Sequence, residues 1–470
     1  MLNSITYELS QAKKLYEESK FKEALQIIND LEKKQGFNVQ ERFKIYYLKS
    51  SILFELGYMN KALKYVELAY KESKQLTNKF QIIDVLFSKI SILGQNDEKN
   101  EVLKTIKKVE QILNTINQTS SMEFKEKNAS LILHKGAYNF SIGELNRSLE
   151  YAAEGLTIAK DIKSKRLMML AYKVLSFDYY LKGDIKRAYE YTKNTLALAK
   201  EINNIQEIIG ALNSIGMFFI EKGEYDQAID NLERSLLLCY EINSFKTIVV
   251  LSSLFEVYFY TNLEKAQKCL DKMKQFIEDN TEYKSSRTFY HLCEAVLLKK
   301  KPQKISHLKA KELLKQIIEK ETPFSQIYYS ALMELCDTYL IISSETNNIK
   351  ILEEINPYFT QLKKIAKTQQ SFWLLVETYS LQAKLKLIIF EFQEAQKLLS
   401  KALDIAGKYS LERLAKRILN EQDEFSKNFI RWEKLKSSNA LISERMELAR
   451  IDEQIEIMLQ KRRYLNIIKS

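Results

Sequence analysis

Three glycines repeat through the chain at intervals of 40 residues. A small residue follows each of them five positions later, giving the pairs Gly143 and Ser148, Gly183 and Ala188, and Gly223 and Ala228. A regular interval of this length is typical of a stacked helical repeat. One such unit cannot bury its apolar face alone, so neighbouring units must shield each other. The spacing therefore predicts an array of units rather than a single closed core.

The unit around Gly223 shows why this interval predicts a pair of helices. Apolar residues recur at helical spacing on both sides of the glycine, at Leu212, Ile215, Phe219 and Leu232. Gly223 itself can adopt the backbone conformation of a turn between two antiparallel helices. Gly216 and Ala228 are small enough to let those helices approach closely, so each unit is expected to be a tight helix pair.

The segment from residue 211 to residue 236, ALNSIGMFFIEKGEYDQAIDNLERSL, resembles the tetratricopeptide repeat. The usual unit of that family has about 34 residues. The interval of 40 residues is similar to that of its long-repeat members, such as kinesin light chains, MalT-type regulators and uncharacterised archaeal proteins. The resemblance implies an all-α fold, a right-handed superhelical α-solenoid in which antiparallel helix pairs stack side by side.

The small residue that opens the second helix marks about ten units. The markers are Ala24, Ala62, Val102, Ser148, Ala188, Ala228, Ala266, Ala310, Ile355 and Ala395. The units around Val102, Ala310 and Ile355 depart from the pattern, so their boundaries are left open. Only 11 glycines and three prolines among 470 residues leave little room for loops. We therefore assign residues 1–408 to one helical array, with no domain boundary inside it.

After residue 408 the chain is free of proline and almost free of glycine. We assign residues 409–438 to a capping helix region, because a terminal helix can cover the exposed apolar end of a solenoid. Phe425, Phe429 and Trp432 are spaced for that packing. Residues 439–470 are assigned to an amphipathic helix, with an apolar stripe of Leu448, Ile451, Ile455 and Met458. This helix either caps the array or pairs with a second copy in a short coiled coil.

The chain shows no sign of secretion or of a membrane span. Its first twenty residues are charged and lack the apolar core of a signal peptide. The longest uncharged stretch, residues 208–220, has 13 residues, whereas a membrane span needs about 20. We expect a soluble cytoplasmic protein in a reducing compartment. Its four cysteines have no disulfide-framework spacing and are expected to be buried or half-buried: Cys239, Cys269, Cys293 and Cys336.

No motif for catalysis, metal binding or cofactor binding is evident, and we expect neither enzyme activity nor a cofactor. The three histidines, His134, His291 and His307, do not stand with acids or cysteines at a metal-binding spacing. His291 and Cys293 are two positions apart, which points their side chains in different directions on a helix. The sequence contains no glycine-rich phosphate loop and no dinucleotide fingerprint.

If the chain is a binding protein, its ligand surface is the groove lined by the first helix of each unit. The resemblance implies that groove positions recur one helical turn apart on that helix. The matching residues are Phe140, Lys173, Phe177, Tyr180, Asn213, Met217, Ile220, Leu251, Phe255 and Tyr258. We expect an aromatic and apolar groove suited to an amphipathic helix or an extended peptide. Alternatively, Phe177 and Phe255 simply pack between neighbouring helices.

Asn213 is the most specific of these candidates. It matches the asparagine with which long-repeat members of the family bind the backbone of a peptide, and an amide can both donate and accept hydrogen bonds. The corresponding residues of adjoining units are Leu133, Lys173 and Leu251, so the family's row of asparagines is not repeated. The other interpretation is an exposed or locally hydrogen-bonded asparagine.

The chain carries 72 basic and 61 acidic side chains, a formal net charge of +11. Its one dense basic cluster looks like an insert, in which Pro302 should interrupt any helix. The lysines are Lys299, Lys300, Lys301, Lys304, Lys309, Lys311 and Lys315. Clustered lysines can bind phosphate or an acidic partner through counterion release. We favour a solvated loop between helices, and a nucleic-acid partner is not expected.

Together these features predict a non-enzymatic scaffold or adaptor that binds a protein or peptide in its superhelical groove. The first alternative is a regulatory sensor, in which a ligand tightens the superhelix and alters binding to a second partner. Such a sensor requires that the ligand have different affinities for two shapes. The second alternative is binding of nucleic acid or an acidic partner through residues 299–315, with an affinity that falls steeply as salt rises.

Overall fold

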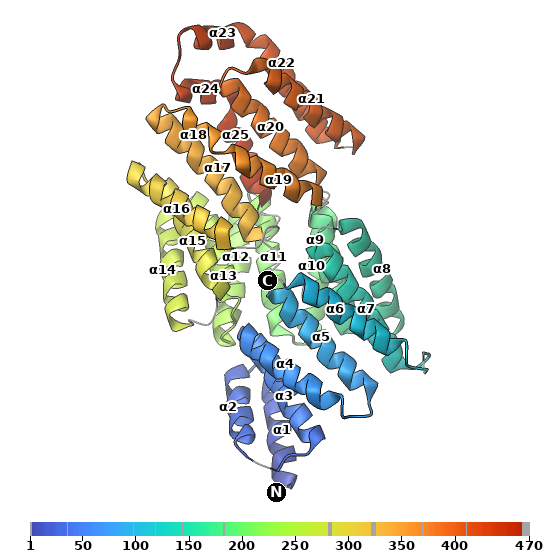
Figure 1. Ribbon diagram of the computed structural model, residues 1–470. Coiled ribbons are helices and arrows are strands. Elements are labelled where there is room, and N and C mark those ends of the chain that lie inside the picture. The colour runs from blue at the N-terminus through green and yellow to red at the C-terminus, as the bar shows by residue number, and fades with distance from the viewer. Residues whose placement is uncertain are drawn as a thin grey trace. The chain divides into compact units, whose positions relative to one another are not determined.

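The computed structural model describes residues 2–462, apart from residues 35, 97, 118, 143, 182–183, 281–283, 321–325, 369–370 and 410. All regular elements within these described residues are helices, labelled α1 to α25 (Figure 1). None of the described helices is long and apolar enough to cross a membrane. The predicted all-α architecture is therefore confirmed.

Ten pairs of helices follow one another along the described residues. The first helices are α1 (Leu2–Glu17), α3 (Val39–Glu55), α5 (Lys79–Gln95), α7 (Met122–Ser141), α9 (Lys165–Leu181), α11 (Ile205–Lys222), α13 (Thr247–Thr261), α15 (Lys284–Lys299), α17 (Gln326–Thr346) and α20 (Phe372–Ile388). The second helices are α2 (Phe21–Glu32), α4 (Met59–Ser73), α6 (Lys99–Leu113), α8 (Leu145–Asp161), α10 (Ile185–Glu201), α12 (Tyr225–Glu241), α14 (Leu263–Asp279), α16 (Lys304–Lys320), α19 (Asn356–Thr368) and α21 (Phe392–Lys408). The short α18 (Lys350–Glu353) precedes α19. Four helices complete the chain: α22 (Glu412–Lys427), α23 (Phe429–Ser437), α24 (Ile442–Ala449) and α25 (Ile451–Arg462).

The ten marker residues are all buried, as the repeat predicts. In eight pairs the marker is the fourth residue of the second helix. The exceptions are Ala310, which is the seventh residue of α16, and Ile355, which lies between α18 and α19. Because α16 already begins at Lys304, the lysine cluster is not an insert between repeats. The expected interruption by Pro302 is confirmed, since α15 ends at Lys299 and α16 begins only after the proline.

In four pairs the marker is opposed by the residue twelve positions before it, on the first helix of the same pair. The hydroxyls of Ser50 and Ser176 each donate a hydrogen bond of 2.9 Å to the marker's carbonyl, on Ala62 and Ala188 respectively. In another pair the direction is reversed, and the marker hydroxyl of Ser148 donates to the Gly136 carbonyl at 2.9 Å. Such bonds require the two backbones to lie unusually close, so the opposing residue has to be small.

Two glycines of the central unit have the roles that the sequence predicted. Gly223 ends α11 in the left-handed conformation, with a φ of 75°, and its N–H donates to the carbonyls of Phe219 and Ile220. Gly216 lets α11 and α12 approach closely, because a Cβ added there would lie only 2.6 Å from the Cγ of Leu232. The other two repeating glycines, Gly143 and Gly183, lie outside the described residues.

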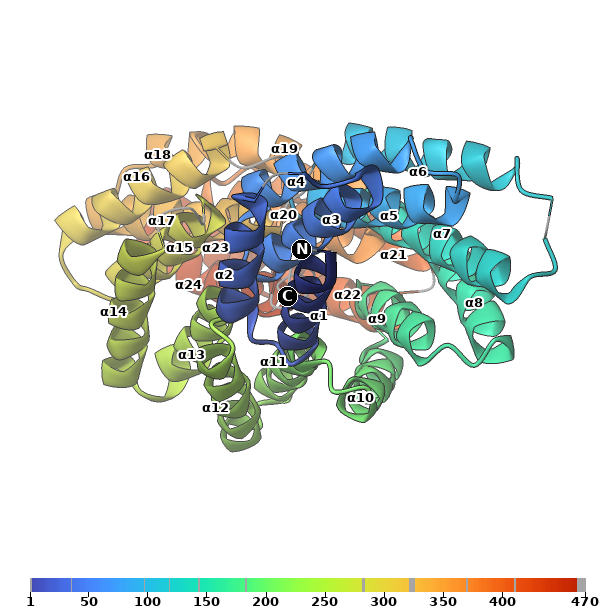
Figure 2. The ribbon, with the colours of Figure 1, turned by 90° about the horizontal axis from the view of Figure 1, so that it is seen from below.

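The contacts divide the chain into two compact units, with a boundary between residues 286 and 287 that the sequence did not indicate. Within unit 1, which contains α1 to α14, the pairs curve round as a layer of first helices inside a layer of second helices (Figure 2). The inner helix α13 is buried over almost its whole length, whereas outer helices such as α14 bury a single face.

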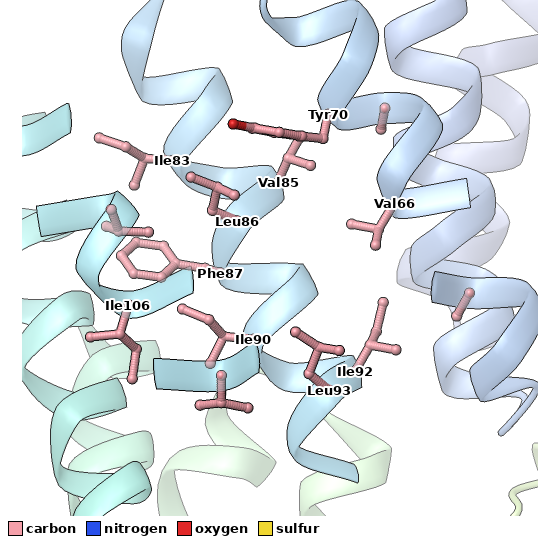
Figure 3. Close-up of a cluster of buried hydrophobic side chains, with 14 of the residues drawn as sticks. Val66, Tyr70, Ile83, Val85, Leu86, Phe87, Ile90, Ile92, Leu93 and Ile106 are labelled. Atoms are coloured by element: carbon pink, nitrogen blue, oxygen red, sulfur yellow. The ribbon is translucent and has the colours of Figure 1, made fainter. Parts of the chain in front are cut away.

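Apolar side chains fill the space between neighbouring pairs. Figure 3 shows one such cluster, in which side chains of α5 pack against α4 on one side and α6 on the other. Val66 and Tyr70 come from α4, Phe87 and Ile90 from α5, and Ile106 from α6. Because α5 contacts both neighbours, it is apolar nearly all round, which explains why its sequence lacks a clear polar face.

Unit 2 contains α15 to α25 and ends in an aromatic cap. The ring of Phe392 on α21 lies 5.8 Å from Phe425, 5.7 Å from Phe429 and 6.2 Å from Trp432, measured between centroids. Phe425 and Trp432 are buried, whereas Phe429 is partly exposed. The helices α22 and α23 thus cover the apolar edge of α21, in the place where a further repeat would pack.

The apolar stripe of the last helices is buried within unit 2. Ile451, Ile455 and Met458 are fully or almost fully buried, and α24 and α25 contact the first helices α17 and α20. Leu448 is only half-buried. The stripe is therefore largely covered by its own chain, and pairing of this segment with a second copy stays a prediction.

We predict that Gly216→Ala destabilises unit 1 by about 1–3 kcal/mol, because the new methyl group forces α11 and Leu232 apart. Gly94→Ala is the matched control in α5, since nothing lies within 4 Å of a Cβ at that position. It should stabilise the chain slightly, by no more than about 1 kcal/mol. Urea unfolding followed by circular dichroism measures both. Equal effects of the two substitutions would contradict the close approach.

Candidate binding surface on the inner helices of unit 1

The structure places every predicted groove residue on a first helix of unit 1. They lie on four helices: Phe140 on α7; Lys173, Phe177 and Tyr180 on α9; Asn213, Met217 and Ile220 on α11; and Leu251, Phe255 and Tyr258 on α13. The rings of Phe140 and Phe177 contact each other across neighbouring helices, with centroids 5.9 Å apart. Tyr180 makes an edge contact with Phe218, at 5.2 Å. That these residues line one ligand groove stays a prediction.

Most of these side chains are packed rather than open to solvent. Only Lys173 and Phe177 are half-buried. The others are buried: Phe140, Tyr180, Asn213, Met217, Ile220, Leu251, Phe255 and Tyr258. Tyr258 donates a hydrogen bond of 2.8 Å to Glu233 on α12, so its hydroxyl points to the outer layer and not into a groove. The expectation of an open aromatic groove is therefore wrong for the α11 and α13 residues.

Asn213 is the exception to this apolar packing. Its side chain is only 1% exposed, yet neither the amide nitrogen nor the amide oxygen has a hydrogen-bond partner. Leaving a buried donor or acceptor unpaired costs about 1–3 kcal/mol, so nearly all such groups in folded proteins are satisfied. The interpretation of Asn213 as an exposed or locally bonded residue is wrong. An unused two-way hydrogen-bonding group lies instead inside the inner layer.

A polar cluster lies one to two helical turns before Asn213, around the beginning of α11. Its centre is Gln206, whose amide nitrogen donates to the Glu55 backbone carbonyl at 3.3 Å and whose amide oxygen accepts from Ser244 at 3.0 Å. The Lys246 ammonium donates to the Gln206 backbone carbonyl at 3.0 Å. Gln206, Ser244 and Lys246 are buried. The cluster joins the end of α3 to the beginnings of α11 and α13.

These contacts connect the second helix pair to the sixth and seventh pairs within unit 1. A further bond at the surface links α2 of the first pair to the residues between α12 and α13, since the Lys22 ammonium donates to the Asn243 side-chain oxygen at 2.9 Å. We call the contacts of Glu55 with Gln206 and of Lys22 with Asn243 the latch. The residues of the latch are far apart in sequence, with 151 positions between Glu55 and Gln206, and no motif marks them. Sequence reasoning therefore missed the latch.

Charged side chains surround the buried end of α3. The Lys173 ammonium lies 3.1 Å from the Glu207 carboxylate. Burial opposes ionisation of Glu207, but Lys173 and Lys246 outweigh it and lower the pKa of this carboxyl. Burial lowers the pKa of Lys246, although Glu207 and Glu55 counteract this. Desolvation raises the pKa of Glu55 to about 7, against the attraction of Lys246 and Lys173.

The lysine cluster at residues 299–315 lies in unit 2 and is largely engaged. Lys299 is buried and forms ion pairs with Glu334 and Asp337. Lys309 lies 2.8 Å from Glu294, and Lys311 and Lys315 lie over the Tyr339 ring. Lys300, Lys301 and Lys304 are exposed at the turn between α15 and α16. The solvated-loop interpretation is thus correct for the turn only, since the rest belongs to helices.

The remaining candidates for chemistry are isolated and buried. Within the described residues no three His, Cys, Asp or Glu side chains gather as a metal site would require. Burial lowers the pKa of His134 to about 4 and raises the pKa of Cys239 to about 12. All four cysteines are buried, as the sequence predicted, and none of them forms a disulfide bond.

No protein-family model matches the chain, and no curated protein matches it in sequence. Solved structures match in shape. A Rap protein crystallised with competence and sporulation factor superposes with a TM-score of 0.52 at 13% identity, covering 78% of this chain and 99% of that protein. The chain has the fold of a tetratricopeptide-type helical repeat protein.

Two further structures are more distant in shape. The apo quorum sensor NprR of B. thuringiensis gives a TM-score of 0.44 at 16% identity, covering 77% of this chain and 99% of that protein. NprR in complex with its cognate peptide NprX gives 0.45 at 11% identity, covering 82% and 100%. The assignment of the helical repeat fold rests on the Rap protein and on the helix pairs of the chain.

We predict that Glu55→Gln stabilises the protein at pH 8.5 and has little effect at pH 5. The folded state holds the Glu55 proton more tightly than the unfolded state does. Below the ordinary pKa of 4.5 the carboxyl is neutral in both states, so its burial costs no stability there. The cost of ionising it grows as the pH rises through about 7, up to at most about 3 kcal/mol. Thermal unfolding at the two pH values measures the difference. A difference that stays constant with pH would show that Lys246 and Lys173 fully compensate the burial.

Proposed function

We propose that unit 1 binds a peptide or a helical segment of a partner protein on its inner helices, and that the chain acts as a non-enzymatic scaffold or adaptor in the cytoplasm. The observation that carries this proposal is the buried, unpartnered amide of Asn213. A fold that leaves such a group unsatisfied loses stability, and a ligand that hydrogen-bonds to it restores the lost interaction.

The chemistry of the site favours a polypeptide ligand. A side-chain amide donates through its nitrogen and accepts through its oxygen, which matches the paired N–H and C=O groups of a peptide main chain. Half-buried Phe177 lies on α9, the first helix of the pair before that of Asn213, and provides apolar contact area. Lys173 and Glu207 provide charged groups at the same layer. Main-chain recognition combined with apolar contact is the common mode of peptide binding.

We predict that Asn213→Leu stabilises the chain and abolishes ligand binding. Leucine has nearly the same shape as asparagine and removes the unpaired polar atoms, so the free energy of unfolding should rise by about 1 kcal/mol or more. Peptides would first be selected from a displayed random library with the full-length wild-type chain. Their affinity, measured by fluorescence anisotropy, should fall at least about tenfold in the variant, which corresponds to about 1.4 kcal/mol.

Asn231→Leu is the matched control, because it makes the same substitution on α12 of unit 1. The Asn231 side chain is half-buried, and its amide nitrogen donates to the Gln227 backbone carbonyl, one turn earlier in the same helix, at 2.8 Å. This control should leave peptide affinity unchanged. Equal affinity of wild type and Asn213→Leu for the selected peptides would place the ligand elsewhere. A less stable Asn213→Leu variant would show that the amide is already satisfied.

A regulatory sensor is the second candidate, and the latch favours it. Because Asn213 is almost inaccessible, a ligand can reach it only when the inner helices move apart, and the latch opposes that movement. A ligand that binds only the open shape shifts the balance between two shapes. Its apparent affinity is reduced by the fraction of molecules that are closed. Such coupling would connect peptide binding to a change in shape that a second partner can read.

We predict that loosening the latch strengthens peptide binding if unit 1 is a sensor. The double variant Lys22→Ala, Ser244→Ala removes the surface bond and the support of Gln206 without touching Asn213. Removing bonds worth about 1–2 kcal/mol should raise peptide affinity several-fold, because the open shape is then more populated. Isothermal titration with a selected peptide measures the change. An unchanged affinity would favour the plain adaptor over the sensor.

A further inference from the structure

The inner surface of unit 2 is polar in its residue types but buried in the structure. It is formed by the first helices α17 and α20, and Glu377, Ser380 and Thr338 on these helices are completely buried. Lys384 is only 8% exposed. Burial lowers the pKa of Lys384, although Glu421 and Glu453 counteract this. Residues of this kind are normally solvated, so a covering element must satisfy them.

The helices α24 and α25 form this cover, and they do so through polar contacts of specific kinds. The Lys384 ammonium donates to the carbonyls of Ala449 and Arg450, at 2.9 and 3.2 Å, and thereby caps the carboxyl end of α24. The Gln454 amide donates to the Glu377 carboxylate at 2.7 Å and accepts from Ser380 at 3.3 Å. A cation at a helix carboxyl end is favourable, because the helix dipole is negative there.

Apolar contacts complete the recognition of these helices. Ile451, Ile455 and Met458 recur at spacings of three and four and are buried in unit 2, where α25 contacts α17 and α20. The stripe and the Gln454 amide belong to α25, and the capped carboxyl end belongs to α24 before it. A helix seated on a surface through its apolar face is a mode of helix-in-groove binding. The surface thus recognises features that any amphipathic helix of suitable sequence can present.

The helices α24 and α25 contact α17 and α20, and they also border a cleft. A cavity of about 620 Å³ lies between α24 and α25 on one wall and α22 and α23 on the other, with α20 at its floor. Arg417, Arg431 and Arg450 line it together with Glu421 and Glu447, so it is polar. The cover is also interrupted, because Arg450 separates α24 from α25 with a φ of 48°. Helices of the repeat array itself are packed against neighbours on both sides.

We propose that the inner surface of unit 2 is a binding surface for an amphipathic helix of a partner protein, and that α24 and α25 occupy it as the chain's own ligand. The partner helix carries apolar residues at spacings of three and four and a glutamine or asparagine that meets Glu377, as α25 does. A short helix before it ends at Lys384, as α24 does. The attached helices compete with it at a high effective concentration, so binding is weak until they detach.

The test uses the full-length chain and a fluorescent synthetic peptide of residues 439–462. The variant Ile451→Ala, Ile455→Ala weakens the attached helices but leaves the surface intact, and it should bind the peptide at least about tenfold more tightly than wild type does. Replacing the peptide's Gln454 with leucine should weaken binding about tenfold. A designed helix with the same apolar spacing and one glutamine, but an otherwise unrelated sequence, should bind within about tenfold of the native peptide.

Three outcomes would overturn the proposal. The first is that neither wild type nor the folded variant binds the native peptide. The second is that the native peptide binds but the designed helix does not, which would make α24 and α25 an ordinary part of the fold. The third outcome concerns hydrogen exchange of the unmodified chain, a measurement that does not require the variant to fold. We expect amides of α24 and α25 to exchange at least about tenfold faster than those of α17 and α20, and exchange at equal rates would contradict detachment.

Discussion

The close approach of the two helices in each pair is the constraint on which the rest of the structure depends. Ser50 and Ser176 bond directly to the backbone of the opposing helix, and Gly216 leaves no room for a methyl group beside Leu232. Close pairs stack in a regular way, because in eight of the ten pairs the marker is the fourth residue of the second helix. The stacking places all first helices of unit 1 in one inner layer. The position of every candidate binding residue follows from this arrangement.

The two units use their inner layers differently. In unit 2 the chain itself meets two buried charged residues of the inner helices, since Gln454 bonds to Glu377 and the carboxyl end of α24 bonds to Lys384. In unit 1 the Asn213 amide has no such partner. We propose that α24 and α25 occupy the surface of unit 2, and that the ligand of Asn213 comes from another molecule. The same repeat geometry thus supports two different states of occupancy.

Sequence alone predicted the helical array well, because its signals are local. Ala188 and Ala228 mark their helix pairs through a fixed spacing, and the same spacing found Ala62 and Ala395. The inner position of Asn213 followed from the family resemblance. Its burial could not be predicted, and neither could the burial of Phe255 or Met217, because burial depends on how successive pairs curve.

The long-range contacts lay beyond sequence reasoning for a physical reason. Glu55 and Gln206 meet only because five helix pairs turn the chain back on itself, and small changes in packing at each pair add up over that distance. No residue pattern near Glu55 or Gln206 therefore predicts that the two residues are in contact. The contact of α25 with α17 and α20 is similar, since its apolar stripe fits a coiled coil and an internal surface equally well.

Hydrogen exchange of the full-length chain, with and without a peptide selected on it, tests the central claim most directly. The claim is that a ligand binds to the inner helices of unit 1 at Asn213. The account predicts slower exchange in α9 and α11 when the peptide is present, with α17 and α20 of unit 2 unchanged. Protection confined to unit 2 or to the outer helices of unit 1, with α11 unchanged, would contradict it.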